Sequence, residues 1–411
     1  MACKLWNQAA EIFAWWPKQK VQVPNYRNSY IVPWSSFPAT LKQELDKYLD
    51  HLAGKDRFKQ RGFKPLRPAS LFSRAVQIHE YCSALFHAGY DVSKLTSLAD
   101  LIAPDAVDAG LSWFLDVRKA ERQAHGISVI LVILAKHWVK LSGEPLKDLQ
   151  EVCKSLNKTP RGMTAKNRQR MHQFDDAEVL DALIKLPRTL RKVAEKTKTD
   201  CKRALLIQTA VAIEILLMAP IRLTNLSHLE VGRHIIRMRK GVVRLSIPED
   251  EIKNEQAYDV VFLPETSALI EHYIDKHLPV LQRGKPSSWL FPGYKGPKAH
   301  PPLRKQIMDT IKRHCGAVLH PHGFRHLIAK LILDAEPGAY GKARLVLNHT
   351  STSTTERVYS GTENAAATRH YDRQILERRG PWKPDDATRG AKASRGRTAD
   401  KDGGKGKRNA A

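Results

Sequence analysis

Along most of the chain, apolar residues recur with the period of an α-helix. The run from residue 39 to residue 54, with leucines at Leu41, Leu45 and Leu49, predicts an amphipathic helix that ends at Gly54. Between residues 69 and 142, further runs with apolar residues at i, i+3 and i+4 follow one another. Their combined length is that of a common small domain, so they predict a compact bundle of helices.

The pattern changes in the second half of the chain. Acidic residues at Asp175 and Asp176 favour a helix start, and a strongly apolar helix follows at about 202–219. Two short β-rich segments, 241–247 and 259–264, then predict antiparallel strands before the helical period returns. The predicted fold is therefore mainly α with a small antiparallel β-sheet, the second domain being of the α+β class.

Breaks in these patterns set the expected domain boundaries. The region 380–411 has no hydrophobic period and consists mostly of Gly, Lys, Arg, Ala and Asp, as disordered tails do. The expected parts are an N-terminal extension with a helix and a basic strip (1–65), a helical bundle (66–153), a basic linker (154–173), a second domain (174–379) and the disordered basic tail (380–411).

The charge of the chain indicates a polyanionic partner. The chain has 68 Lys and Arg against 42 Asp and Glu, a formal net charge of +26. The tail from Arg389 holds eight basic and two acidic residues, about +6, so about +20 remains on the rest. Nucleic acid is the first candidate, although a ribosome-associated or membrane-surface protein would show the same balance.

Basic residues concentrate in the predicted strip and linker. We expect these to contact the DNA backbone, the alternative being a solvated run of charge. They are Lys55, Arg57, Lys59, Arg61, Lys64, Arg161, Lys166, Arg168 and Arg170.

The cysteines argue for a reducing compartment. There are five, an odd number, scattered without a CxxC pair, which excludes a disulfide framework and a Cys-rich zinc site. The N-terminus lacks a signal-peptide pattern, so we expect a cytoplasmic protein. His320 and His322 alone do not make a metal site, because no third and fourth ligands stand at a suitable spacing.

Five polar residues supply the parts of a phosphodiester-cleaving site. Arg222 follows the apolar helix, His322 and Arg325 begin a later helix, His349 lies in a polar turn, and Tyr359 follows it. Guanidinium groups neutralise an anionic phosphoryl transition state, histidines move protons, and a deprotonated tyrosine is a nucleophile. Each residue alone is a weak signal, since arginines and tyrosines at such positions are usually surface charges or packing groups.

Together, these residues resemble the tyrosine recombinase (phage integrase) family over about 174–365. MAPIRLTNLSHLEV, containing Arg222, resembles the first family box, and HPHGFRH, containing His322 and Arg325, resembles the second. LNHTSTSTTERVYSG resembles the third, with His349 as its histidine and Tyr359 as its nucleophile.

The resemblance has three departures. Asn225 stands where the family often has an acidic residue, and Asn348 stands in place of the usual glycine. The ten-residue step from His349 to Tyr359 is one residue longer than is usual. Ser353 and Glu356 are spaced as an S-x-x-E capping box, which would begin a short helix that carries Tyr359.

The family also places a lysine in a β-hairpin between the first two boxes. EIKNEQAYDVVFLP resembles that hairpin, which makes Lys253 the candidate. Lys240, in RMRKGVV, is the alternative. We favour Lys253 because it lies at the expected turn, whereas Lys240 precedes the expected strands.

The resemblance implies a site-specific recombinase with an N-terminal helical DNA-binding bundle and a C-terminal catalytic domain. It would cleave and rejoin DNA through a 3′-phosphotyrosyl intermediate without metal, ATP or any cofactor. Its implied partners are double-stranded DNA with specific recombination sites, a homotetramer on that DNA and an accessory DNA-bending or directionality factor. The resemblance also implies a nucleoid-associated enzyme that belongs to a mobile genetic element. The alternatives are a type IB-like topoisomerase and a DNA-binding protein without catalysis.

Overall fold

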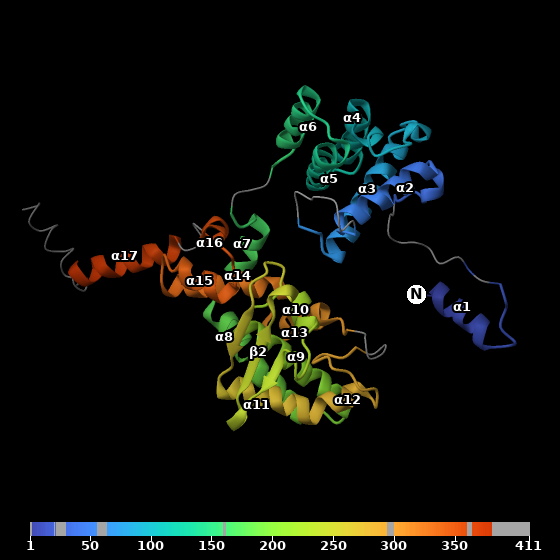
Figure 1. The fold of residues 1–411 in the computed structure, drawn as a ribbon. Helices are drawn as coiled ribbons and strands as arrows, with labels where there is room; N and C mark the ends of the chain where they lie inside the picture. Colours follow the sequence, from blue (N-terminus) through green and yellow to red (C-terminus); the bar gives the residue numbers. More distant parts are fainter. Residues whose placement is uncertain are drawn as a thin grey trace, which may run out of the picture. The chain divides into compact units, whose positions relative to one another are not determined.

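The structure is a computed structural model that describes residues 2–19, 21, 30–55, 64–158, 162–293, 300–359 and 364–379. The chain divides into two compact units (Figure 1). We call Met1–Thr159 the N-terminal unit and Pro160–Ala411 the C-terminal unit.

The described residues of the N-terminal unit form helices joined by turns and irregular segments. Its helices are α1 (Ala2–Ile12), α2 (Ala39–Leu52), α3 (Pro68–His87), α4 (Pro104–Ser112), α5 (Glu121–Leu134) and α6 (Glu144–Ser155). Short 3₁₀ turns lie at Trp34–Ser36, Val92–Lys94 and Asp100–Ile102, and π-type turns continue α4 over Trp113–Val117 and α5 over Ala135–Val139.

The core of this unit extends further toward the N-terminus than we predicted. The apolar face of α2, with Leu41, Leu45 and Tyr48, is buried in one cluster with side chains of α3 to α6. We had placed α2 in an N-terminal extension and begun the bundle at residue 66. An amphipathic helix must bury its apolar face, and α2 does so against the bundle that follows it.

The C-terminal unit carries the remaining helices. They are α7 (Ala165–His172), α8 (Ala177–Glu195), α9 (Asp200–Met218), α10 (Leu223–Ser227), α11 (Pro264–His272), α12 (Leu278–Gln282), α13 (Leu303–Cys315), α14 (Pro321–Ala335), α15 (Tyr340–Leu347), α16 (Thr352–Tyr359) and α17 (Asn364–Arg379). A π-type turn at Tyr273–His277 links α11 to α12.

Helix α9 is the central element of the C-terminal unit. From Ala204 to Met218 its sequence is apolar around most of its circumference, and its residues from Ile207 to Ile213 are all buried. It contacts α8, α11, α12, α13 and α14. A helix that is apolar all round must be enclosed by other elements. Because α9 is fixed in this way, the chain directly after it, which carries Arg222, starts from a rigid position.

A three-stranded antiparallel sheet packs in the same described core. Its strands are β1 (Ile235–Arg237), β2 (Val243–Ile247) and β3 (Tyr258–Val261), in the order β1-β2-β3. Residues Val243, Leu245 and Ile247 of β2 are buried in alternation, as one core-facing side of a strand requires. The prediction of a mainly α fold with a small antiparallel sheet is confirmed, although we expected only β2 and β3. With three residues, β1 is too short to show an alternating pattern.

The segment 154–173, predicted as a linker, contains the end of α6 and all of α7. Met163 and Met171 belong to the core of the C-terminal unit, and α7 contacts α14. Thr164 caps α7, its hydroxyl accepting the backbone N–H of Asn167 at 3.3 Å. Only residues 159–161 of this segment lie outside the described residues. The basic residues of α7 are thereby fixed to the C-terminal unit.

Several predicted features lie outside the described residues, among them the whole tail 380–411 and part of the basic strip. Within the described part of the chain, no helix combines the length and the apolar character needed to cross a membrane.

Candidate active site

Arg222 stands at the junction between α9 and α10. It is the N-cap residue of α10 and is half-buried. Its Nη1 lies 3.5 Å from Oδ1 of Asn254, a long contact that leaves most of the guanidinium's donors available. Loss of solvent lowers the pKa of Arg222, which nevertheless remains a cation at neutral pH.

Arg325, on the first turns of α14, is held much more tightly. Its side chain is 5% exposed, and it donates from Nη1 to the carbonyl of Pro220 at 2.7 Å and from Nη2 to that of Leu347 at 2.6 Å. These bonds tie the end of α9 to the end of α15. Burial, followed by the charge of Arg222, lowers the pKa of Arg325 to about 10.

The two arginines face a common hollow. It is lined by Arg222 and Arg325 together with Ile221, Asn225, Ile247, Ile252, Tyr258 and Asn348, and its volume is about 10 Å³. Among the described residues, no carboxylate is paired with either guanidinium. Two partly desolvated cations without an acid are costly to bury, and an anion bound between them would offset that cost.

Two histidines lie within the field of these arginines. His322, exposed on the first turn of α14, has its pKa lowered by partial loss of solvent and then by Arg325, His320 and Arg222. Burial, followed by the charges of the two arginines and His322, lowers the pKa of His349 to about 4. Both rings are therefore neutral at pH 7 and able to accept a proton or a hydrogen bond.

His349 is joined to the helix that carries the predicted nucleophile. Its Nδ1 lies 2.9 Å from the hydroxyl of Thr355, a fully buried residue of α16. Helix α16 begins at Thr352, so Ser353 is already inside it and is not the cap that we expected. The hydroxyl of Ser351 instead accepts the backbone N–H of Ser353 at 3.1 Å.

Tyr359, the last residue of α16, points into the core. Its side chain is 2% exposed, and its hydroxyl lies 3.1 Å from Nδ1 of His326 and 3.5 Å from the carbonyl oxygen of Arg325. Burial raises the pKa of Tyr359 to about 12, and the charge of Arg325 lowers it by a smaller amount. The phenol is protonated at neutral pH, so an attack on phosphorus requires removal of that proton.

The two candidate lysines occupy different connections of the sheet. Lys253 is exposed in the β2–β3 connection next to Asn254, which contacts Arg222. Lys240 is exposed in the β1–β2 connection, with φ +63°. We expected Lys240 to precede the strands, but β1 comes before it, so Lys240 lies within the sheet's connections. In an antiparallel meander these connections lie at opposite ends of β2, roughly 15 Å apart. The site lies at the Lys253 end.

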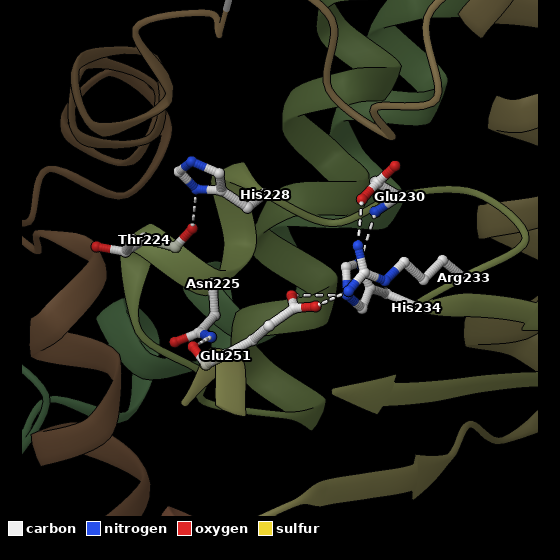
Figure 2. Close-up of polar contacts among 7 residues, drawn as sticks. All are labelled: Thr224, Asn225, His228, Glu230, Arg233, His234 and Glu251. Atoms are coloured by element: carbon white, nitrogen blue, oxygen red, sulfur yellow. Dashed lines mark hydrogen bonds and ion pairs between the residues drawn. The ribbon is translucent and has the colours of Figure 1, made fainter. Parts of the chain in front are cut away.

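A polar cluster holds the start of the Lys253 connection, as Figure 2 shows. The carboxylate of Glu251 pairs with Arg233 and, at 2.9 Å, with Nε2 of His234. His234 is 2% exposed, and its Nδ1 accepts the backbone N–H of Glu230 at 3.0 Å. This fixes the proton on Nε2, from which His234 donates to Glu251.

The cluster also explains the first departure from the family pattern. The side-chain amide of Asn225, on α10, donates to the backbone carbonyl of Glu251 at 3.3 Å (Figure 2). An ionised carboxylate at this position has no proton to donate, so this bond requires the amide. Asn225 thus fastens the β2–β3 connection to the helix that follows Arg222.

Asn348 explains the second departure. It ends α15 with φ +49°, in the left-handed region where glycine is favoured and asparagine is the next best tolerated residue. Its side-chain amide donates to the carbonyl of Gln256 at 3.0 Å, and Asn254 donates to its backbone carbonyl at 2.6 Å. The turn before His349 and the connection that carries Lys253 are therefore joined.

The predicted DNA-contacting residues are only partly described. Lys166 and Arg168 are exposed on α7, and Arg170 is half-buried. Burial, followed by the charge of Arg170, lowers the pKa of His320. Lys55 is exposed and pairs with Asp50 at 2.7 Å, and Lys64 is exposed. Arg57, Lys59, Arg61 and Arg161 lie outside the described residues.

Sequence reasoning did not single out His326 or Asn254. His326 lies within the HPHGFRH motif, four residues after His322, a spacing that places both rings on neighbouring turns of one helix face. Their ring centroids are 5.1 Å apart. Asn254 carried no sequence signal, because its contacts join it to residues about 30 and 94 positions away.

Among the residues whose placement is described, no three or more His, Cys, Asp or Glu side chains are grouped so that they could hold a metal ion.

Residues 187–365 match the sequence profile of the phage integrase family. These residues form a phage integrase family domain. The matched region contains Arg222, Arg325, His349 and Tyr359, and the predicted family is confirmed. None of the curated protein sequences matches the chain.

The chain is also similar to solved recombinase structures. XerH site-specific recombinase bound to difH substrate is 14% identical, with a TM-score of 0.48 and coverage of 80% of this chain and 98% of that one. A lambda integrase dimer bound to a COC′ core site is 13% identical, with a TM-score of 0.45 and coverage of 80% and 79%. XerA recombinase is 12% identical, with a TM-score of 0.31 and coverage of 83% and 100%.

Proposed function

We propose that the chain cleaves and rejoins DNA at specific sites through a covalent bond between Tyr359 and a 3′-phosphate. Its family domain makes it a site-specific DNA recombinase, an enzyme, and the proposal concerns the residues that perform the reaction. One observation carries the assignment: two partly buried arginines face a common hollow without a carboxylate among the described residues. A phosphodiester is the anion that such a pair binds bidentately.

The proposal gives each of these residues a role in the reaction. Arg222 and Arg325 bind the non-bridging oxygens and neutralise the charge that the transition state spreads over them. His322 accepts the proton of Tyr359, whose oxygen forms a bond to phosphorus as the bond to the 5′-oxygen breaks. Lys253 donates a proton to that 5′-oxygen, and His349 donates a hydrogen bond to the phosphate. Rejoining reverses these steps, and the phosphoester bond is retained throughout without a nucleotide or a metal ion.

The proposed partners follow from charge and family. Double-stranded DNA that carries specific recombination sites is the substrate, and the exposed cations of α7 bind its backbone beside α14. We extend the proposal to a homotetramer on DNA, helped by an accessory DNA-bending or directionality factor. We also propose that the enzyme works in the cytoplasm, on the nucleoid, as part of a mobile genetic element.

Covalent trapping tests the proposed function. The full chain is incubated in EDTA with nicked DNA from the ends of its own genetic element, and products are separated on denaturing gels. We expect a protein–DNA adduct with the wild type and none with Tyr359→Phe, since phenylalanine has no oxygen to attack with. Tyr371→Phe is the matched control, because Tyr371 is an exposed tyrosine of α17. An adduct that persists in Tyr359→Phe would contradict the assignment.

Relaxation of supercoiled DNA, DNA binding and strand exchange between two sites, measured with the same two proteins, separate the alternatives. A type IB-like topoisomerase would relax supercoiled DNA without exchanging strands between two sites. If the chain only binds DNA, the wild type and Tyr359→Phe should bind the same DNA equally well, and neither protein should form an adduct. Exchange of strands between two sites, lost in Tyr359→Phe, would support the recombinase.

A further inference from the structure

His326 is the residue of the site to which the reaction scheme gives no role. It follows Arg325 on α14, and its ring is turned inward, 8% exposed. Its Nδ1 lies 3.1 Å from the hydroxyl oxygen of Tyr359, and the two ring centroids are 5.6 Å apart. The predicted nucleophile is therefore in contact with a buried imidazole, and the predicted base His322 lies one helical turn before that imidazole.

The protonation states set the kind of hydrogen bond that joins the two side chains. Burial, followed by the charges of His322, His320, Arg325 and His349, lowers the pKa of His326 to about 4. The ring is neutral at pH 7, so one of its nitrogens is an acceptor. Tyr359 is protonated, and its hydroxyl also lies 3.5 Å from the carbonyl oxygen of Arg325, to which it can donate. The Tyr359 oxygen and Nδ1 of His326 therefore share a hydrogen bond between two neutral groups, and its donor depends on which ring nitrogen of His326 carries the proton.

This bond belongs to a state in which the phenol oxygen cannot attack. At 2% exposure, Tyr359 offers no surface to a DNA phosphate held at the two arginines. Attack requires α16 to shift so that the oxygen reaches phosphorus, and the bond to His326 breaks when that happens. After cleavage the oxygen is part of a phosphoester, so the bond to His326 is absent from the covalent intermediate.

We propose that His326 is a positioning residue that withholds Tyr359, through a hydrogen bond that must break before the phenol can attack DNA. The inference deepens the proposed function and rests on it. Because the bond stabilises only the uncleaved state, it slows cleavage and leaves rejoining unaffected. An effect on cleavage without an effect on rejoining distinguishes this role of His326 from a packing role, which would change the rates of both reactions.

Single-turnover cleavage of nicked DNA tests the inference. His326→Leu removes the hydrogen-bonding ring and keeps an apolar side chain in the core, while His326→Asn keeps an amide, which can donate or accept, close to the position of Nδ1. We expect cleavage by His326→Leu to be roughly 3- to 10-fold faster than by the wild type, the range that one net hydrogen bond accounts for. His326→Asn should restore the wild-type rate, and rejoining from the purified covalent intermediate should be equal in all three proteins.

A slower or unchanged cleavage rate in folded His326→Leu would overturn the inference, and a slower rate would point to His326 as a base. Failure of the wild type to form any adduct would count against the proposed function instead. A second measurement needs no DNA: 3-fluorotyrosine is placed at position 359 of the full chain and its ¹⁹F signal is recorded. His326→Leu should move that signal toward the solvent-exposed position, and an unmoved signal would contradict the withheld state.

Discussion

The half of the site built on α14–α16 and the half built on α10 and the β2–β3 connection differ in how their side chains are held. Arg325, His326 and Tyr359 are buried and bonded to one another or to backbone carbonyls. Arg222 has one long contact, and Lys253 is exposed. The buried half is fixed before DNA arrives, whereas the open half keeps its donors for the substrate. We therefore expect substitutions in the open half to reduce the cleavage rate alone, and substitutions in the buried half also to change the free energy of unfolding.

We expect Lys253 to show the largest difference between an effect on the cleavage rate and an effect on stability. Lys253→Ala should reduce the cleavage rate by about 10²- to 10⁴-fold, the usual effect of losing a general acid, and leave the unfolding free energy nearly unchanged because the side chain is exposed. Cleavage is measured on nicked DNA in a single turnover. A substrate with sulfur in place of the 5′-bridging oxygen should restore the rate, since a thiolate leaves without a proton.

Lys240→Ala is the matched control, because Lys240 is an exposed lysine in the other connection of the same sheet. It should cleave both substrates at wild-type rates. If Lys240→Ala, and not Lys253→Ala, shows the loss that sulfur corrects, then the general acid has been assigned to the wrong connection.

The two arginines test the comparison directly. Arg222→Lys and Arg325→Lys should each reduce cleavage by about 10²- to 10³-fold, because lysine lacks the bidentate fork. Only Arg325→Lys should also lower the unfolding free energy, by about 1–3 kcal/mol, since it leaves a buried carbonyl of Pro220 or Leu347 without its donor. Stability is measured by urea titration with a short deuterium pulse read on peptides of α14. Equal destabilisation by the two variants would contradict the difference between the halves.

The smallest expected effect is the loss of folding stability at low pH, which involves only residues of the buried half. His326 and His349 have pKa values of about 4 in the folded chain, against about 6.5 when unfolded. Between these values the unfolded chain binds more protons, so stability is present above about pH 6.5 and is lost as the pH falls toward 4. Each histidine should contribute up to about a tenfold rise in the unfolding constant per pH unit in this window.

The same pulse-labelled titration, repeated from pH 7 to pH 4.5, checks this. His326→Asn and His349→Asn should each lower the slope of stability against pH, and the double variant should lower it by the sum. An unchanged slope in both single variants would mean that neither ring is kept neutral by the fold.

Much of the site could be predicted because its residues lie in contiguous motifs. Asp176 caps α8 as its sequence indicates, its carboxylate accepting the N–H of Glu178 at 2.8 Å. His322 and Arg325 begin a helix as expected, and Pro321 occupies its first turn. The fold class and the family followed from these local signals, since helical period, caps and motif spacing are properties of neighbouring residues.

Other features depended on contacts that no local pattern encodes. The strand β1 has three residues and exists because Ile235 and Arg237 pair with Leu245 and Val243 of β2. The placement of the linker's basic helix on α14 likewise came from packing, which a reading of its polar sequence did not indicate.

By itself, the sequence determined the helices, the net charge and the set of reactive residue types, because these need only the order of side chains along the chain. Only the tertiary structure decided that Tyr359 is buried against His326 and that the guanidinium of Arg325 is bonded to two carbonyls while that of Arg222 is not. It also decided which sheet connection lies at the arginines. Burial and hydrogen bonding between residues 22 to 105 positions apart set these states, and such distances are fixed only once α9, α14 and the sheet have packed together.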